Sequence, residues 1–240
     1  MPHHTTLSST TRVWEHYAAV YDRLAKHYPL YNALMDRLEA LLHGPLPAGA
    51  AVLDAACGTG NLSVRLAPRY RVTALDRAGA MLDRAADKSC TLVPPGFRIV
   101  TADLDRPLPF ASGAFDAVAC IHALYAVATP AATLAEFQRI IKPGGLLLIA
   151  NMTRPIALGE TAMEVLRLQG LRRGVRTLRH LLAVGWWNAR LARFQSAGVM
   201  HFWPQAEFNR LLAEAGFTPL QQEMTYTCNI DLVTLARRTP

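Results

Sequence analysis

The sequence predicts an α/β fold with a doubly wound, mostly parallel sheet, on the basis of its composition and of the order of its elements. Hydrophobic residues make up 51% and charged residues 18% of the 240 residues, which is enough apolar material for one large core. Short apolar segments alternate with stretches long enough for helices, at residues 51–56, 71–76, 97–103, 115–121 and 146–151. Strands that alternate with helices form parallel sheets with right-handed crossovers. The composition also excludes a fibrous or disordered protein.

Two amphipathic helices are expected before the first strand. A polar, flexible leader over residues 1–12 precedes a single domain over 13–240. Within 13–43, Pro29 divides a segment whose apolar side chains recur at helical spacing. These side chains include Trp14, Tyr17, Tyr21 and Leu24. We expect this N-terminal helical segment to form a lid over a ligand.

A helix and a turn lead into the fifth apolar segment, and an insertion follows it. Thr129 and Pro130 are typical of a helix start, and the helix should end at Ile141 before a tight turn over 142–145. The alternation then stops over 152–203, which we interpret as a helical insertion that shapes a substrate pocket. A helix over 205–215 and strands over 218–226 and 230–237 are expected after it.

Neither a membrane span, a secretion signal nor a metal site is expected. The longest apolar stretches, 117–128 and 181–187, are shorter than the roughly 20 residues that cross a bilayer. The N-terminus lacks the basic start and apolar stretch of a signal, so a cytoplasmic location is expected. The cysteines are far apart and form no C-x-x-C pair, which predicts neither a disulfide nor bound zinc. They are Cys57, Cys90, Cys120 and Cys228.

A glycine pair follows the first strand, in the sequence DAACGTGNLS over residues 54–63. Such a turn at the carboxyl end of a parallel strand lets a ligand approach the backbone closely. A dinucleotide fingerprint would need Gly or Ala at the position of Ser63, and the carboxylate of Asp54 would repel a phosphate. The loop therefore favours a cationic or amino-bearing ligand and argues against a nicotinamide-dependent oxidoreductase.

Acidic residues lie at the carboxyl ends of three successive strands. Asp76 ends the second strand, where a carboxylate can accept both hydroxyl protons of a ribose. Asp103 ends the third strand, and Asp54 ends the first. Because the carboxyl ends of parallel strands share one edge of a sheet, these three carboxylates are expected along one ligand-binding rim.

The order and spacing over residues 51–151 resemble those of the class I S-adenosylmethionine-dependent methyltransferases. The segment VLDAACGTGNLS is similar to the family's glycine motif, FDAVACIHALYAV to its fourth strand and following loop, and RIIKPGGLLLIAN to its fifth strand with a Pro-Gly-Gly turn. The resemblance, strongest to the small-molecule and ubiquinone/menaquinone-biosynthesis branch, implies a Rossmann-like sheet of seven strands with an antiparallel last strand. It also implies N-terminal helices, a helical insertion after the fifth strand, and S-adenosylmethionine as cofactor, with S-adenosylhomocysteine as product.

The same resemblance implies roles for individual residues. The loop around Gly58 and Gly60 would wrap the methionine part of the cofactor, and Asp54 would face its amino group or the loop. Asp76 would bind the ribose, Met81 would pack on the adenine, and Asp103 with the Leu104 backbone would read the adenine edge. The complete expected cofactor site comprises Tyr17, Tyr21, Asp54, Ala55, Cys57, Gly58, Gly60, Asp76, Arg77, Met81, Ala102, Asp103, Leu104, Ile121 and His122.

Catalysis of methyl transfer requires few protein groups. A base is needed only when the acceptor is a hydroxyl or an acidic carbon. His122 is the best candidate, since its unperturbed pKa lies near neutrality, although a histidine there can also merely pack beside the cofactor. Tyr21 is a second candidate, and Tyr17 and Tyr21 either close over the cofactor or serve as packing aromatics. The acceptor pocket is expected to include Tyr125, Asn151, Trp186, His201 and Trp203.

Most of the net charge of +7 falls in the insertion. Between Glu160 and Met200 there are seven arginines and two glutamates, a net charge of +5. A basic amphipathic helix weakened by Gly170 and Gly174 is predicted, with one apolar face. That face would carry Leu168, Leu171, Val175, Leu178 and Leu182. The helix is interpreted as a lid over the active site, as a membrane-surface element through 160–195, or as a contact for an anionic substrate.

Three functional hypotheses follow. The leading one is S-adenosylmethionine-dependent methyl transfer, by in-line displacement, to a small apolar or aromatic molecule. The alternative is a methyltransferase for a membrane-associated quinone precursor or phospholipid amine that docks through the basic helix. An RNA-binding or RNA-modifying protein is the third hypothesis, but the sequence contains no RNA-reading motif. The loop after the fourth strand also lacks the Asn/Asp-Pro-Pro-aromatic run that is typical of exocyclic-amine methylation of DNA bases. Nucleic acid is therefore not the expected partner.

Overall fold

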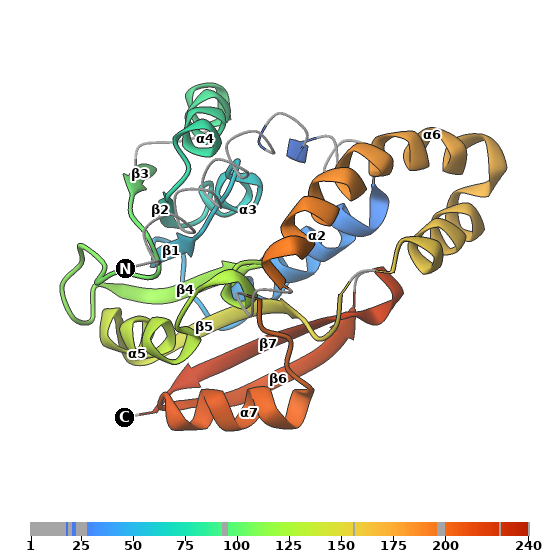
Figure 1. Cartoon of the computed structure of the whole chain (residues 1–240). Coiled ribbons are helices and arrows are strands. Elements are labelled where there is room, and N and C mark those ends of the chain that lie inside the picture. The colour runs from blue at the N-terminus through green and yellow to red at the C-terminus, as the bar shows by residue number, and fades with distance from the viewer. Residues whose placement is uncertain are drawn as a thin grey trace, which may run out of the picture.

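Seven strands form one mixed sheet in the computed structural model (Figure 1), which describes residues 18, 21–22, 28–92, 96–155, 157–195, 200–225 and 227–239. The strands are β1 (Ala51–Ala55), β2 (Arg71–Asp76), β3 (Arg98–Thr101), β4 (Phe115–Ile121), β5 (Ile141–Met152), β6 (Phe217–Thr225) and β7 (Asp231–Arg238). Their order is β3-β2-β1-β4-β5-β7-β6. The first five strands are parallel, and β7 is antiparallel to both of its neighbours. The predicted Rossmann-like sheet with an antiparallel last strand is confirmed.

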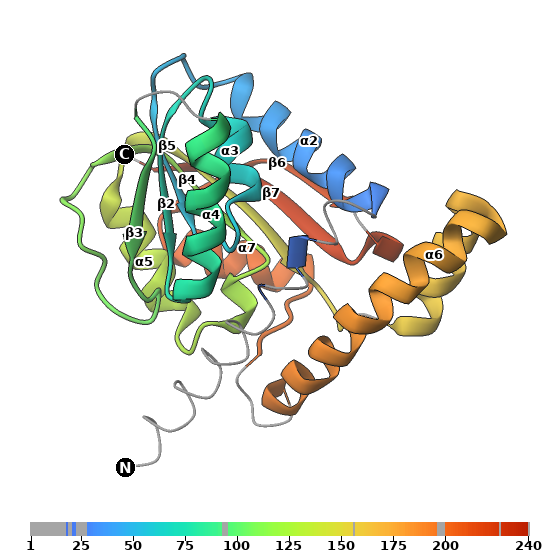
Figure 2. The same cartoon turned by 90° about the horizontal axis from the view of Figure 1, so that it is seen from above.

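Helices cover both faces of this sheet. They are α2 (Pro29–His43), α3 (Asn61–Leu66), α4 (Gly79–Leu92), α5 (Pro130–Ile140), α6 (Leu158–Gln195) and α7 (Gln205–Glu214), with short 3-10 turns η1 (Leu124–Ala126) and η2 (Thr227–Asn229). One buried cluster joins α2, α3 and the start of α4 to one face of the sheet, and a second joins α5 and α7 to the other. Figure 2 shows these two helical layers from above.

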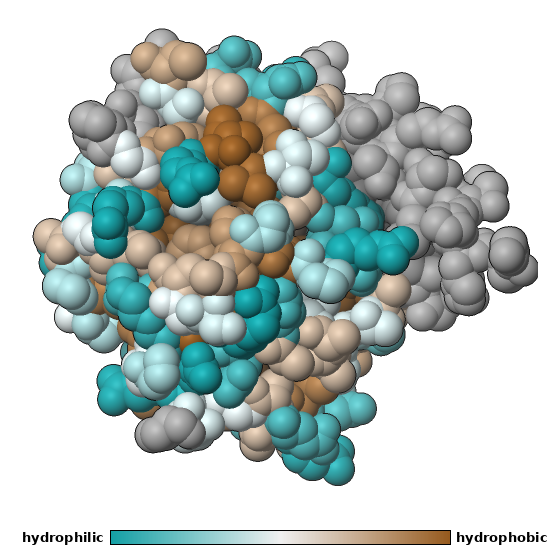
Figure 3. Space-filling view, turned by 90° about the vertical axis from the view of Figure 1, so that its left-hand side faces the viewer, coloured by the Kyte–Doolittle hydropathy of each residue, from teal (hydrophilic) through white to brown (hydrophobic). Residues whose placement is uncertain are grey.

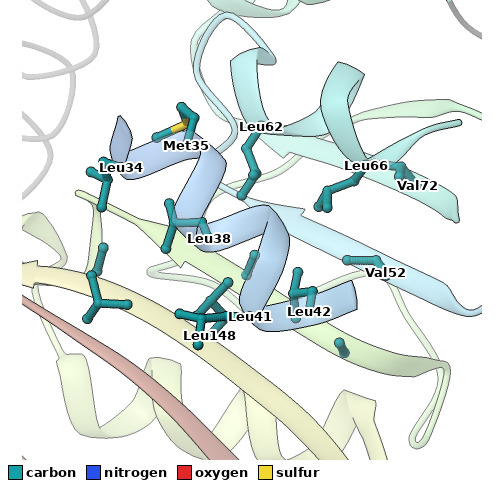
Figure 4. Close-up of a cluster of buried hydrophobic side chains, with 14 of the residues drawn as sticks. Leu34, Met35, Leu38, Leu41, Leu42, Val52, Leu62, Leu66, Val72 and Leu148 are labelled. Atoms are coloured by element: carbon teal, nitrogen blue, oxygen red, sulfur yellow. The ribbon is translucent and has the colours of Figure 1, made fainter. Parts of the chain in front are cut away.

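The packing of α2 explains why its sequence is helical and where it lies. Pro29 occupies the first turn, where its missing N–H costs no hydrogen bond. Leucines three or four residues apart then point into the cluster of Figure 4, where Leu38 and Leu42 are fully buried against α3 and the sheet. Replacing one such leucine by alanine removes about 2–5 kcal/mol of stability.

The expected turn at 142–145 is instead the start of β5. Ile141 already pairs with Phe115, and the register shifts before Ala117 pairs with Leu146. Gly144 has φ of +74°, which lets the backbone bulge without leaving the sheet. A Cβ on Gly145 would lie 2.7 Å from the carbonyl oxygen of Asp116, so only glycine fits beside β4. The glycines therefore shape a bulged strand.

The insertion is a broken helix in place of a continuous one. Gly170 has non-helical angles, φ 69° and ψ 173°, and divides α6, whereas Gly174 stays helical. The two halves lie side by side in Figures 1 and 2 and project beyond the sheet. Gly174 permits their contact, because a Cβ there would lie 2.9 Å from Leu166 Cδ2. No helix within the described part of the chain is long and apolar enough to cross a bilayer.

The predicted apolar face of this insertion is only partly covered. Leu178 is half-buried against the core cluster that includes Val165. The other four predicted members are exposed: Leu168, Leu171, Val175 and Leu182. These four side chains are therefore not covered by the protein's own core, whereas the role of the insertion as a lid stays a prediction.

Candidate functional site

The sequence-predicted residues meet at one edge of the sheet, at the carboxyl ends of β1 to β5. Since β7 is antiparallel to β5, its first residue reaches the same edge, where Asp231 pairs with Met152. The edge has two parts. The glycine-loop half contains the turn after β1 with Asp76, Met81 and Asp103, and the His122 half contains His122, Tyr125, His201 and Asp231.

The turn after β1 is held in a sharply bent conformation. Ala56, Gly58 and Gly60 have φ of 57°, 54° and 74°. A Cβ on Gly60 would lie 2.9 Å from Ala85 Cβ, so α4 approaches the turn too closely for any side chain. The Cys57 N–H donates to the Leu75 carbonyl at 2.8 Å, and the Cys57 thiol is half-buried beside Gly58. The turn is therefore held at a fixed position at the carboxyl end of β1.

Asp76 organises the turn through backbone donors. Its carboxylate accepts the Gly58 N–H at 2.9 Å and the Ala78 N–H at 2.9 Å. Burial raises the pKa of Asp76, and these backbone hydrogen bonds oppose that rise. The side chain thus stands where the resemblance implies a ribose-binding carboxylate.

Asp54 is turned away from the open part of the edge. It is buried, and the Ser63 hydroxyl at the start of α3 donates to its carboxylate. Burial raises its pKa to about 6, while the Ser63 hydrogen bond lowers it and the nearby charge of Asp76 raises it further. Of its two expected roles, contact with the cofactor's amino group or with the loop, this geometry favours the second. Ser63 therefore has a partner of its own, which explains why it stands where dinucleotide sites have glycine.

Part of the N-terminal segment lies against the glycine turn. The position of a Cβ on Gly58 is 3.9 Å from both Met81 Sδ and Tyr21 Cε1, so these two side chains flank the turn. The next residue, Asp22, accepts a hydrogen bond from Lys88 Nζ at 2.7 Å and one from the Thr59 hydroxyl at 2.5 Å. Asp22 thus ties the segment to the turn and to α4. Tyr17 lies outside the described residues.

The remaining residues of this half surround Asp103. Its carboxylate lies 3.6 Å from Arg77 and accepts the Asp105 N–H at 3.1 Å. The Ala102 N–H donates to the Asp76 carbonyl at 3.1 Å, which extends the pairing of β2 and β3. Leu104 is buried beside them. The predicted residues Ala55 and Ile121 end β1 and β4 and form the floor.

His122 makes a side-chain hydrogen bond to Asp231 that the sequence analysis did not predict. It follows β4 with φ of 54°, and its N–H donates to the Ala150 carbonyl at 2.9 Å. Its Nε2 makes a short hydrogen bond to Oδ2 of Asp231, which is fully buried. Burial alone would lower the pKa of His122, but the charge of Asp231 and the hydrogen bond to it outweigh burial and raise the pKa. Among the described residues, Asp231 Oδ1 has no hydrogen-bond partner.

Asp231 lies in the strand predicted over 230–237 but was not among the predicted site residues. The signal was present: the segment NIDLV places one acid at the start of an apolar strand. Combined with the antiparallel direction of that strand, this acid had to lie at the ligand edge. A carboxylate there, beside the residue after β4, is the expected orienting partner of His122.

Aromatic side chains build the rest of the His122 half. Tyr125 is buried and its ring stacks on Phe202, with centroids 6.1 Å apart. His201 stacks on Trp203 at 5.5 Å, and its N–H donates to the Tyr125 carbonyl at 2.8 Å. Within the described part of the chain, His201 Nε2 is buried without a partner.

Two further residues, Asn151 and Trp186, were expected in the acceptor pocket. Asn151 is buried, and its side-chain oxygen accepts the Tyr125 N–H at 3.1 Å, so it supports the pocket wall. Trp186 belongs to α6, but its side chain lies outside the described residues.

Comparisons with known proteins agree with this geometry. Residues 53–149 match a family model described as a methyltransferase domain. The chain is 36% identical over 159 residues to malonyl-[acyl-carrier protein] O-methyltransferase of Laribacter hongkongensis, a match that covers 62% of this chain and 52% of that one. It is 33% identical over 147 residues to ubiquinone/menaquinone biosynthesis C-methyltransferase UbiE of Syntrophotalea carbinolica, covering 57% and 61%. The match thus spans about half to three fifths of the length of these relatives.

A solved structure shares the fold over nearly the whole chain. Magnesium protoporphyrin IX methyltransferase (ChlM) of Synechocystis PCC 6803 with bound S-adenosylhomocysteine has a TM-score of 0.65 at 20% identity, covering 96% of this chain and 100% of that one. The matched sequence, the strand order and the bent glycine turn together show that residues 53–149 carry a methyltransferase domain, similar to those of the ubiquinone/menaquinone C-methyltransferases.

Proposed function

We propose that this protein transfers a methyl group from S-adenosylmethionine to a small, apolar or aromatic molecule that loses a proton in the reaction. The observation that carries the proposal is the His122–Asp231 pair at the same sheet edge as the glycine turn. A nearby base is useful when the acceptor is a hydroxyl or an acidic carbon, and of little use when it is a neutral amine.

The glycine-loop half fits the cofactor. Gly58 has no Cβ to block the approach of a ligand, and Tyr21 and Met81 provide apolar contacts on either side of it. Asp76 supplies a carboxylate at the end of β2 for hydroxyl groups, next to Asp103 at the end of β3. When bound, the cofactor supplies a methyl group on a positively charged sulfur, and the thioether that remains is neutral and needs no proton from the protein. The residues of this half therefore act by positioning.

The His122 half supports the role of base. Asp231 accepts a hydrogen bond from Nε2, which fixes the ring, and we propose Nδ1 as the nitrogen that takes up the proton of the acceptor. The negative charge of Asp231 stabilises the protonated ring, and this effect keeps the pKa of His122 above its ordinary value. His122 is the proposed catalytic residue, and Asp231 is a positioning residue that acts through it.

The aromatic surroundings support an apolar or aromatic acceptor. Tyr125 with Phe202, and His201 with Trp203, offer stacked rings beside His122. Asp231 Oδ1 and His201 Nε2 have no hydrogen-bond partner among the described residues, and buried polar atoms are normally hydrogen-bonded, so one or two polar groups of a bound molecule could pair with them. A ring that carries a hydroxyl or carbonyl group matches this combination.

A second candidate is favoured by the exposed apolar residues of α6. A membrane-associated quinone precursor or a phospholipid amine would be reached if α6 bound the bilayer. The two acceptors differ at His122: a quinone precursor loses a proton from oxygen or carbon, whereas a neutral amine needs no base.

Binding of the cofactor is tested by thermal melts with S-adenosylmethionine, S-adenosylhomocysteine and NAD. A ligand at about a hundred times its dissociation constant stabilises by roughly 2.7 kcal/mol, which raises Tm by about 5–10 °C for a domain of this size. We expect the two adenosyl ligands to produce this shift, Asp76→Ala to lose most of it, and NAD to have no effect. A shift with NAD alone would contradict the cofactor assignment.

Methyl transfer is tested with methyl-labelled cofactor and paired acceptors. Each pair shares one apolar ring and differs in the accepting group: a hydroxyl or acidic carbon against an amine. We expect label on the hydroxyl or carbon member, and loss of that label in His122→Asn. Label on the amine members alone, unaffected by His122→Asn, would sink the proposed role of the base.

A further inference from the structure

The exposed apolar side chains of this protein are concentrated on α6. Five of the eight large hydrophobic residues that are exposed within the described chain fall between Met163 and Leu182. Leu168, Leu171, Val175 and Leu182, here called the α6 stripe, are 46% to 74% exposed. Exposed leucines normally occur singly on a protein surface, so a concentration of this kind marks a contact surface.

The geometry of α6 presents the stripe away from the body of the protein. The break at Gly170 turns the chain, and the two halves project beyond the sheet in both Figure 1 and Figure 2. Thr177 donates to the Gln169 side chain at 2.6 Å across the break, which holds the halves together. Leu171, Val175 and Leu182 are spaced four and seven residues apart and therefore share one helix face.

The charged residues of α6 after Glu164 all have the same sign. No acidic residue occurs between Glu164 and Glu207, whereas the segment 165–195 contains seven arginines. Among them, Arg172 and Arg173 are exposed and lie immediately after Leu171. Figure 3 views the side of the protein opposite to α6, where a hydrophobic patch is surrounded by hydrophilic residues. An apolar helix face flanked only by cations is typical of helices that lie in an anionic lipid surface.

Two other occupants fit less well. A second copy of the chain would bring two arginine-rich surfaces together, and like charges at an interface cost binding energy. A folded acidic partner would have to enclose a narrow, projecting pair of helices, whereas lipid adapts to any projecting shape. We propose that the α6 stripe, with Arg172 and Arg173, docks this protein on an anionic lipid bilayer.

The proposed docking surface is connected to the His122 half of the sheet edge. Glu164 in the first half of α6 accepts the Cys228 N–H at 2.8 Å, three residues before Asp231. The surface that meets the bilayer is thus linked through η2 to the strand that carries Asp231. An acceptor that partitions into lipid would be concentrated at this side of the protein.

The test is co-sedimentation of the full chain with vesicles of phosphatidylcholine containing phosphatidylglycerol, and with vesicles of phosphatidylcholine alone. We expect binding to the anionic vesicles that weakens at high salt. Arg172→Glu with Arg173→Glu should reduce partitioning by about thirty-fold or more, since one arginine near an anionic surface contributes about a fivefold change. Leu171→Ser with Leu182→Ser should reduce it at least tenfold through lost apolar insertion.

Matched controls separate this surface from net charge and from general hydrophobicity. Arg106→Glu with Arg210→Glu makes the same charge change at exposed sites elsewhere, and Ile99→Ser with Leu220→Ser removes exposed apolar side chains elsewhere. Both controls should bind like the unchanged protein. Absence of binding at low salt, equal losses in the controls, or a change of oligomeric state in the stripe variants would overturn the proposal. A melt with S-adenosylhomocysteine verifies folding, and the readout is independent of methyl transfer.

Discussion

The two halves of the sheet edge use their polar groups in different ways. In the glycine-loop half, Asp54 is bonded to Ser63, Asp76 to two backbone N–H groups, and Asp103 to Arg77 and a backbone N–H. In the His122 half, one oxygen of Asp231 and one nitrogen of His201 have no partner among the described residues. The first half is thus already fixed in the shape that a single ligand requires. The second has buried polar atoms with which a ligand could pair, and we propose that it selects the acceptor.

The largest effect is expected from removing the proposed base. His122→Asn suits the position because asparagine tolerates positive φ. Turnover of a hydroxyl or carbon acceptor should fall by about 10²–10⁴-fold, measured as initial rates with labelled cofactor, while S-adenosylhomocysteine affinity stays the same. His43→Asn, on α2, is the matched control and should keep full activity. If His122→Asn lowered turnover and cofactor affinity equally, the two halves would not have separate roles.

A substitution in the glycine-loop half should instead weaken cofactor binding and lower the stability of the protein. In Gly60→Ala the new Cβ would meet Ala85 at 2.9 Å in a left-handed backbone conformation. Strain and overpacking together are expected to cost about 2–4 kcal/mol, visible as a lower Tm and weaker binding of S-adenosylhomocysteine by calorimetry. Gly79→Ala begins a helix with open space around it and should change stability by less than about 0.5 kcal/mol. If both variants behave alike, the close approach of α4 does not shape the turn.

The pH dependence tests whether Asp231 acts through His122. A base must be unprotonated, so kcat/KM should rise with pH through the pKa of His122, which Asp231 holds above 6.5. In Asp231→Asn the burial of the ring remains and lowers its pKa, so the midpoint of the acid limb should move below 6.5. The plateau should fall by about tenfold because the ring loses its orientation. An unchanged midpoint would show that another group titrates.

The contribution of the His122–Asp231 pair to the stability of the folded protein should decrease with rising pH, whereas the activity increases. Because the folded pKa of His122 is raised, its contribution to stability is complete below the unfolded pKa near 6.5 and is lost as pH rises through the folded value. The protein is therefore least stabilised by this pair in the pH range where the base is most active.

The smallest effect is expected from an ion pair remote from both halves. Arg37 on α2 contacts Glu223 on β6 with 2.6 and 2.9 Å hydrogen bonds at a half-exposed site. Arg37→Ala should cost no more than about 1 kcal/mol in denaturant unfolding and leave turnover and cofactor affinity unchanged. A loss of turnover here would mean that the edge depends on distant contacts.

The sequence predicted the glycine-loop half better than the His122 half, for a physical reason. Local turn chemistry and strand-end position determine Gly58, Gly60 and Asp76, and both are visible in neighbouring residues. The His122–Asp231 pair joins residues 109 positions apart and depends on the order and direction of β5 and β7. The break of α6 at Gly170 was similarly hidden, since helical spacing continues on both sides of it.

The position of Asp231 on the last strand also bears on how the protein acquires its activity. β1 to β5 and their helices include His122 and the whole glycine turn, whereas Asp231 reaches His122 only when β7 pairs with β5. Until then His122 lacks its carboxylate. A molecule in which β7 were unpaired would therefore keep the glycine turn but lack the carboxylate partner of the proposed base, so the strand that completes the sheet also completes the proposed base pair.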